Sequence, residues 1–374
     1  MLGKRRLNIN LIKFIQFNLP LTMKLSLIVT LVFIGLNLSF HSQINDTVRL
    51  NHYKVLASHN SYKKHPNQKV IKFLSKFKKQ LGPSNDPEQM DYGHVPLPEQ
   101  FDNYNIRGIE IDVNYDPKGG LYRKRKVNNL ITGLRQKVKD PVMKQPGFKV
   151  LHIADVDYET NYLTFKQVLN ELKSWSNAHP NHTPIFVNIE SKGFNPGDES
   201  RFLGFLGFKR ALQFDAQAFQ DLDKEILEIL PADKIFKPTD LKGNYSSIKE
   251  RLNTEGWPLL STCLGKIIFI LEGNNQNLYE QSGVNRPMFV YNPPNGDNTA
   301  FVIKNDPVGN EKEIELLTKK YIVRTRSDAG TLEARANDYT RLKAAIQSGA
   351  QIISTDYYKP DPRFGTFVVK LKAD

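Results

Sequence analysis

The sequence contains a single cysteine, Cys263, among 374 residues, so no disulfide can form within the chain. Stability must therefore come from a hydrophobic core. Hydrophobic residues make up 40% of the chain and charges are mixed among them, which is typical of a globular protein of enzyme size. Gly/Ser-rich or Pro-rich linkers and internal repeats are also missing. We therefore expect one large domain.

Acidic residues are missing from the first 42 positions, which contain five Lys or Arg. An apolar run from Leu25 to Leu36, interrupted by Thr30, follows Met23-Lys24. A basic segment before an apolar run too short to span a bilayer comfortably predicts a signal peptide over residues 1–42. Export would follow its cleavage, to the periplasm, the cell surface or the medium, and Met23 is a candidate start. The alternative is a single-span membrane anchor.

Positive charge dominates two stretches of the remaining chain, 43–374. Residues 54–85 contain eight lysines and no acid, and residues 117–149 contain ten Lys or Arg and one acid. Within the first stretch, residues 69–81 have apolar side chains on one helical side and lysines elsewhere. This pattern predicts either a basic helix on an anionic membrane surface or an ordinary surface helix packed on the domain. Because no recognition motif accompanies the charge, we expect no nucleic-acid partner.

Helical and strand patterns alternate along the chain as they do in βα units. Helices are predicted at 164–178, with Thr164 as N-cap, and at 216–230 and 332–348. Eight interleaved strands predict an α/β fold, a (β/α)8 TIM-type barrel, regular or distorted, with the long basic loops on its C-terminal face. The predicted strands are 53–58, 107–113, 148–153, 184–190, 265–271, 299–303, 321–325 and 351–355.

Carboxylate and amide side chains lie within or just after three of these predicted strands. Glu110 and Asp112 are two residues apart, so both side chains leave the same face of one strand. Two carboxylates on an apolar strand repel each other unless a cation joins them. A hard divalent cation is a natural partner, and Asn60 and Glu190 at neighbouring strand ends can complete the cage. The alternative is that Glu110 pairs with Arg107 or with a lysine from elsewhere.

Two histidines, His59 and His152, also stand at strand ends. A lone histidine there is often only a hydrogen-bonding residue. Two at equivalent heights beside carboxylates suit phosphodiester cleavage, in which one group acts on the attacking oxygen and another protonates the leaving oxygen. A metal then offsets charge on the phosphoryl oxygens. The other histidines, among them His94, fall in polar loops and are assigned no role.

Weaker substrate-binding candidates come from the ends of later strands. Arg326 can hold a phosphate or a polyol with its planar fork, and Asp356 or Tyr357 can line the pocket. Lys192, two residues after Glu190, is a further candidate. For each of these side chains the alternative is a structural salt bridge or a place in an aromatic rim.

Together these residues resemble the phosphatidylinositol-specific phospholipase C superfamily, in particular its secreted calcium-dependent branch. The resemblance covers residues 50–358 and rests on a Ser-His-Asn strand end at 58–60, a Glu-x-Asp strand at 110–112, His152 and Glu190. Three further stretches, at 256–258, 265–269 and 324–328, also look like that branch. No accessory lipid-binding or calcium-sensing module is recognisable in this sequence, so we expect a bare catalytic barrel.

The resemblance implies a role for each matched residue. Ca²⁺ would be held by Asn60, Glu110, Asp112 and Glu190. His152 would protonate the departing diacylglycerol oxygen, and His59 would stabilise the charged transition state. Glu110 or Glu190 would help to deprotonate the inositol 2-hydroxyl, so that an inositol cyclic phosphate forms first. We expect a monomer that acts on an anionic phospholipid and touches the membrane surface.

Two rival functions remain open. Glycerophosphodiester phosphodiesterases also use a barrel with two histidines and a Glu-x-Asp strand. In those enzymes, however, a strand ends in His-Arg, and in this chain Asn60 stands in place of that arginine. The second rival is a non-catalytic barrel that binds anionic lipid or polysaccharide through its lysine-rich rim. The intact histidine pair argues against it. The basic loops leave the preferred head group undecided.

Overall fold

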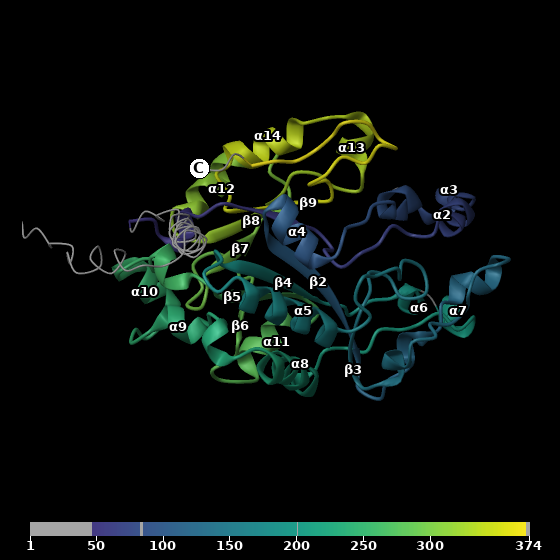
Figure 1. Cartoon of the computed structure of the whole chain (residues 1–374), viewed down its shortest axis with the longest axis horizontal. Helices are drawn as coiled ribbons and strands as arrows, with labels where there is room; N and C mark the ends of the chain where they lie inside the picture. Colours follow the sequence, from purple (N-terminus) through teal and green to yellow (C-terminus); the bar gives the residue numbers. More distant parts are fainter. Residues whose placement is uncertain (1–46, 83–84, 200, 372–374) are drawn as a thin grey trace, which may run out of the picture. The chain divides into compact units, whose positions relative to one another are not determined.

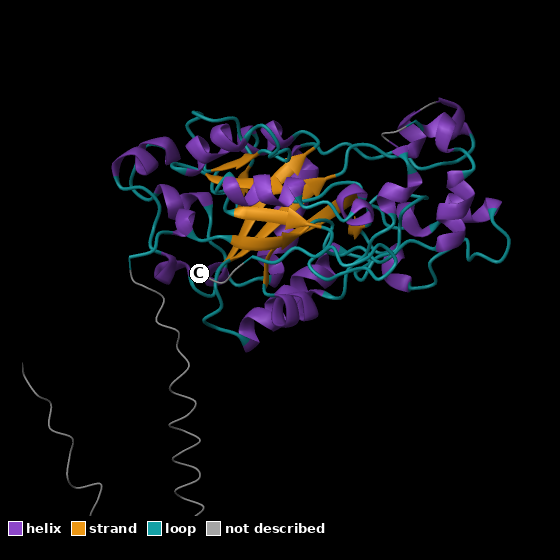
Figure 2. Cartoon of the chain, turned by 90° about the horizontal axis from the view of Figure 1, so that it is seen from above, coloured by secondary structure: helices purple, strands orange, loops and turns teal. Residues whose placement is uncertain are grey.

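The structure is a computed structural model that describes residues 47–82, 85–199 and 201–371, so the predicted signal peptide lies outside the described residues. Its centre is a nearly closed barrel of parallel strands with helices around it (Figures 1 and 2), as the sequence predicts. The strand order is β6-β5-β4-β2-β1-β9-β8-β7, and a bridge between Tyr291 and Phe301 joins the two ends. The barrel strands are β1 (Val55–Ser58), β2 (Ile106–Asp116), β4 (Ile185–Ser191), β5 (Ile267–Gly273), β6 (Met288–Val290), β7 (Phe301–Ile303), β8 (Ile322–Arg326) and β9 (Ile352–Thr355).

The helices surround the barrel, and two predicted ones are confirmed closely. Thr164 caps α5 in a capping box, since it accepts from Gln167 N–H while the Gln167 side chain accepts from the Thr164 N–H. The predicted helix 332–348 is instead two helices separated at Asn337, whose φ is 51°. The α-helices are α2 (Gln68–Ser75), α3 (Lys78–Leu81), α4 (Leu97–Tyr104), α5 (Phe165–Ala178), α6 (Pro196–Glu199), α7 (Arg201–Phe205), α8 (Ala216–Ile229), α9 (Pro238–Lys242), α10 (Ile248–Thr254), α11 (Gln276–Gln281), α12 (Glu311–Thr318), α13 (Leu332–Ala336) and α14 (Thr340–Gln347).

The predicted barrel strand 148–153 is wrong in its direction and place. Its residues form β3 (Gly147–Val150), which pairs antiparallel with the last four residues of β2, from Val113↔Val150 to Asp116↔Gly147. An apolar run indicates a strand, but it does not say with which partner the strand pairs. The barrel strand that the sequence analysis missed is β6, which has only three residues and therefore no readable period.

Successive side chains of β2 point to opposite sides, so that one side packs in the hydrophobic core and the other carries the carboxylates. Ile109, Ile111 and Val113 belong to the hydrophobic core shared with α5 and α8, so Glu110 and Asp112 face the barrel interior. Close packing of β1 on β2 also requires Gly108, because a Cβ there would lie 2.5 Å from the Cβ of Ala57. The predicted division of this strand into an apolar and an acidic side is confirmed.

The basic segment 69–81 forms two short helices, α2 and α3. Val70 of α2 is buried against Val127 and Tyr158, from the loops that follow β2 and β3. The expectation of an ordinary surface helix packed on the domain therefore holds for α2. Within the described residues, none of the helices has the length and apolar character needed to cross a bilayer.

Candidate active site

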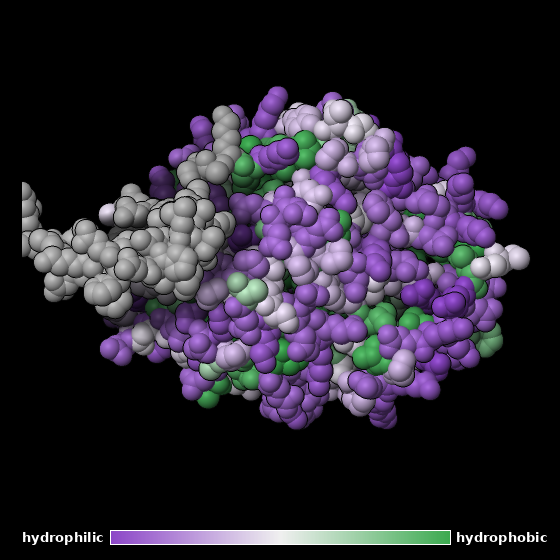
Figure 3. All heavy atoms as spheres, in the orientation of Figure 1, coloured by the Kyte–Doolittle hydropathy of each residue, from purple (hydrophilic) through white to green (hydrophobic). Residues whose placement is uncertain are grey.

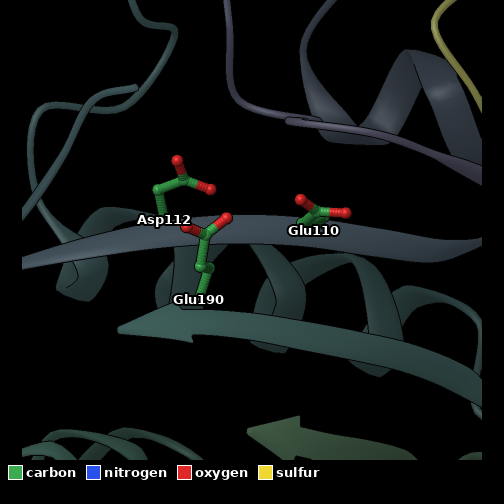
Figure 4. A group of neighbouring side chains, drawn as sticks. All are labelled: Glu110, Asp112 and Glu190. Atoms are coloured by element: carbon green, nitrogen blue, oxygen red, sulfur yellow. The ribbon is translucent and has the colours of Figure 1, made fainter. Parts of the chain in front are cut away.

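Three carboxylates meet where the carboxyl end of β4 lies beside the middle of β2. Glu110 and Asp112 project from the same side of β2, and Glu190 of β4 stands directly across from Asp112 (Figure 4). One oxygen from each of the three lies within 4.8 Å of the others. Burial, together with the neighbouring carboxylates, raises the pKa of Asp112 well above its ordinary value. We call these three side chains the acidic cluster.

Lys192 neutralises part of the acidic cluster. Its Nζ lies 3.0 Å from Asp112 Oδ2 and 2.9 Å from Glu190 Oε1. Burial alone would raise the pKa of Glu190, but the Lys192 ammonium holds that pKa below its ordinary value. The predicted substrate-binding residue Lys192 therefore contacts the acidic cluster directly in this structure.

Arg324 of β8 supplies a second cation from inside the barrel. Its guanidinium is buried, pairs with Glu110, and lies 3.6 Å from Glu272 Oε2. The ion pair considered above for Glu110 thus exists, but with a partner other than Arg107, which donates to Thr183 and to the carbonyl oxygen of Phe101. The strand position of Arg324 gave no sign that it reaches across the barrel to β2.

The acidic cluster fits a hard divalent cation such as Ca²⁺. Every donor atom is a carboxylate oxygen, which Ca²⁺ prefers. Asp112 Oδ1 is buried and has no hydrogen-bond partner among the residues that the structure describes, so it is free to coordinate. Asn60 is buried after β1, where its Oδ1 accepts from the Tyr62 hydroxyl at 3.3 Å. Its role as a fourth ligand stays a prediction.

His59 directly follows β1 and is held by residues from two other strand ends. Its Nδ1 lies 2.8 Å from Asp356 Oδ1, so we assign the ring proton to Nδ1. Its Nε2 lies 3.6 Å from Glu110 Oε1 and 3.3 Å from Arg326 Nη1. Burial, followed by the charge of Arg326, lowers the pKa of His59 well below its ordinary value. The imidazole is therefore neutral, with an electron pair on Nε2.

Two of the predicted substrate-binding residues, Asp356 and Tyr357, are buried. The Asp356 carboxylate is fully buried between His59 and Arg326, so it orients the histidine and does not line an open pocket. Tyr357 packs with Phe364 and Phe367 in the hydrophobic core, which also takes it away from the pocket. Hydropathy alone cannot place these residues, because both follow the same buried strand, β9.

His152 lies in the loop after β3 and has its own carboxylate. Its Nδ1 is 2.8 Å from Asp157 Oδ2, and that oxygen also lies 3.2 Å from the Nζ of the buried Lys63. Burial would raise the pKa of Asp157, but Lys63 and His152 hold it below its ordinary value. The charged carboxylate fixes Nδ1 of His152 as the donor, which leaves Nε2 for proton exchange.

Three supporting residues were missed by the sequence analysis. Asp157 and Lys63 lie in polar loops, where a carboxylate and a lysine are ordinary surface residues. We expected His94 to be a loop residue without a role, and that expectation is wrong. His94 is buried, and its Nε2 lies 2.7 Å from the carbonyl oxygen of His59. Burial lowers the pKa of His94 to about 3, so it stays neutral. It fixes the backbone at the first histidine.

Replacing Lys63 by methionine is expected to destabilise the protein by about 3–5 kcal/mol, because Asp157 would remain as a buried charge without its cation. Lys63 also donates to the carbonyl oxygens of Met90 and Tyr92, at 2.6 and 2.9 Å. The free energy of unfolding in urea tests this, with K63M, D157N and the double variant compared. Additive losses for the two single changes would show that the pair does not interact.

Each of the two histidines is hydrogen-bonded to a carboxylate, and both belong to a barrel with an acidic cluster that fits a cation. This arrangement is typical of a metal-assisted phosphodiesterase. The family model described as "Phosphoinositide phospholipase C, Ca2+-dependent" matches residues 48–374, and the chain therefore belongs to that family. Its members are phosphodiesterases that depend on Ca²⁺ and act on phosphatidylinositol. None of the curated proteins matches the chain.

Two solved structures share the fold of this chain. A calcium-dependent phosphoinositol-specific phospholipase C from Pseudomonas sp. shares 15% sequence identity, with a TM-score of 0.50 over 88% of this chain and 95% of that one. A structure of the same enzyme described as a myo-inositol complex gives a TM-score of 0.51 at 15% identity, over 83% and 91% of the two chains. At this identity the likeness shows the shared barrel fold.

Proposed function

We propose that this family member is an exported enzyme that cleaves the glycerol-side P–O bond of phosphatidylinositol-type lipids and forms an inositol cyclic phosphate. The observation that carries this is the paired arrangement of the histidines. His59 is bound to Asp356 and His152 to Asp157, each through Nδ1 at 2.8 Å. His59 Nε2 lies 3.6 Å from Glu110 Oε1, and His152 follows β3, which pairs with the end of β2 just beyond Asp112. Both histidines are therefore carried beside the strand of the acidic cluster.

In the proposed reaction, His59 Nε2 takes the proton of the inositol 2-hydroxyl, and the hydroxyl oxygen forms a bond to phosphorus. His152 Nε2 gives a proton to the glycerol oxygen as its bond to phosphorus breaks. The products are diacylglycerol and a cyclic phosphodiester. The neutral state of His59 supports a role as proton acceptor, whereas the family resemblance assigns that step to Glu110 or Glu190.

The remaining site residues hold charge. Glu110, Asp112, Glu190 and Asn60 would hold Ca²⁺, which would offset negative charge on the phosphoryl oxygen. Arg326 carries a guanidinium beside His59 that is partly exposed, so its planar fork can meet a phosphoryl oxygen. Lys192 stands at the same rim and can contact the inositol ring or the phosphate.

Phosphorus NMR of the reaction catalysed by the purified full-length chain tests this function. Phosphatidylinositol is incubated with the protein in the presence of Ca²⁺ or of a chelator. We expect the resonance of a cyclic inositol phosphate to appear only with Ca²⁺, and phosphatidylcholine to stay intact. Cleavage of water-soluble glycerophosphodiesters without cleavage of phosphatidylinositol would instead support a glycerophosphodiester phosphodiesterase. Lipid binding without turnover would support the non-catalytic barrel.

A further inference from the structure

Three phenylalanines are exposed in the segment that follows β4, the strand of Glu190. Phe194 comes just after the strand, and Phe202 and Phe205 lie on α7, where they are 66% and 87% exposed. Figure 1 places α6 and α7 beyond the carboxyl end of β2, which is the end of the barrel that carries the acidic cluster. Large aromatic side chains in this position are costly in water unless a partner covers them.

The segment is anchored to the loop that carries His152. Asn195 Oδ1 accepts from the Ala154 N–H at 3.1 Å, just before α6. After α7, the Lys209 N–H donates to the buried carboxylate of Asp155 at 2.6 Å, and the Lys126 N–H donates to the same carboxylate at 3.0 Å. The aromatic side chains are thus held on a braced loop at a set position relative to the site.

Two cations lie beside this aromatic surface. The Lys126 ammonium lies 3.3 Å from the position of a Cβ on Gly207, and the Arg210 guanidinium lies 2.7 Å from that of Gly204. Lys126 belongs to the stretch 117–149, which contains ten Lys or Arg and one acid. Figure 3 shows apolar groups among hydrophilic ones over the region where Figure 1 places α6 and α7. Exposed aromatic side chains beside basic ones complement an anionic lipid surface.

We propose that Phe202 and Phe205 of α7 insert into the interface of an anionic phospholipid bilayer, while the basic residues beside them contact the lipid head groups. This rests on the proposed function and extends it, because it states how the enzyme approaches a substrate that is itself part of a membrane. Opposite charge on the two surfaces favours a bilayer over a protein partner. Docking through α7 brings the acidic cluster and the histidines to the head-group level.

Vesicle sedimentation of the full-length chain tests the proposal, with F202S/F205S compared with V284S. Val284 is 89% exposed in the segment between α11 and β6, which leads into the amino end of a barrel strand. Vesicles of phosphatidylcholine and phosphatidylglycerol are used with a chelator present. We expect the double variant to partition about a hundredfold more weakly and V284S to partition like the original chain. Any contribution of residues 1–46 is the same in every variant.

A kinetic comparison separates this proposal from the proposed function. The double variant should turn over a monomeric short-chain phosphatidylinositol normally and vesicular phosphatidylinositol at least tenfold more slowly. Unchanged vesicle binding by F202S/F205S, or equal losses on both substrates, would overturn the docking surface. Vesicle binding that depends on the two phenylalanines, without cleavage of either substrate, would leave docking intact and overturn the proposed function. Binding only to a protein partner would also refute bilayer docking.

Discussion

Replacing His152 by alanine is expected to lower the turnover of phosphatidylinositol by about 10²- to 10⁴-fold, the usual effect of losing a general acid. Without the imidazole, the glycerol oxygen must leave as an alkoxide or take its proton from water. His59→Ala should have an effect of the same order, because the inositol hydroxyl would lose its proton acceptor. Initial rates of cyclic phosphate release, measured with saturating Ca²⁺, test both changes.

A matched control is available in His179, which stacks on Trp175 after α5, in the segment leading to the amino end of β4. H179A removes the same imidazole group as the two site variants and should keep the activity of the original chain. Far-ultraviolet circular dichroism then shows whether H59A and H152A have kept their fold. If either site variant retained more than half of the original rate with an intact fold, the proposed proton transfers would be refuted.

The second large effect concerns the acidic cluster. Asp112→Asn keeps the shape of the side chain and removes its charge. We therefore expect Ca²⁺ affinity to fall by about 10- to 100-fold. Asp112 is the sharpest choice because its Oδ1 has no hydrogen-bond partner within the described part of the chain. Calorimetric titration with Ca²⁺ measures the affinity without relying on turnover.

The control for this experiment is Asp233→Asn, at an exposed carboxylate in the segment between α8 and α9. It removes the same charge from the whole protein but should leave Ca²⁺ affinity unchanged. A chelator should abolish the activity of the original chain. If D112N bound Ca²⁺ normally, or if the chelator had no effect, Lys192 and Arg324 alone would serve as the cations of the cluster.

The acidic cluster could be predicted from sequence because it follows a simple period. Glu110 and Asp112 alternate with core residues of β2, and Glu190 ends the strand that lies beside it. Parallel strands bring such ends to one face, so the spatial meeting of the three follows from topology. The same argument located His59, which comes directly after β1.

Other parts of the site lie beyond the reach of periodicity. Arg324 is one of several polar residues on β8, and only the finished barrel shows that its guanidinium reaches Glu110. Asp157 and Lys63 come from two different loops and become a buried pair only when these loops pack together. For such contacts the partner is decided by tertiary packing, which leaves no regular spacing in the sequence.

The antiparallel pairing of β3 with the end of β2 separates the position of His152 from the length of the loop before it. The ladder from Val113↔Val150 to Asp116↔Gly147 sets the register, whatever lies between residues 116 and 147. A change in the length or the charge of the segment between these two residues should therefore leave His152 in the same place.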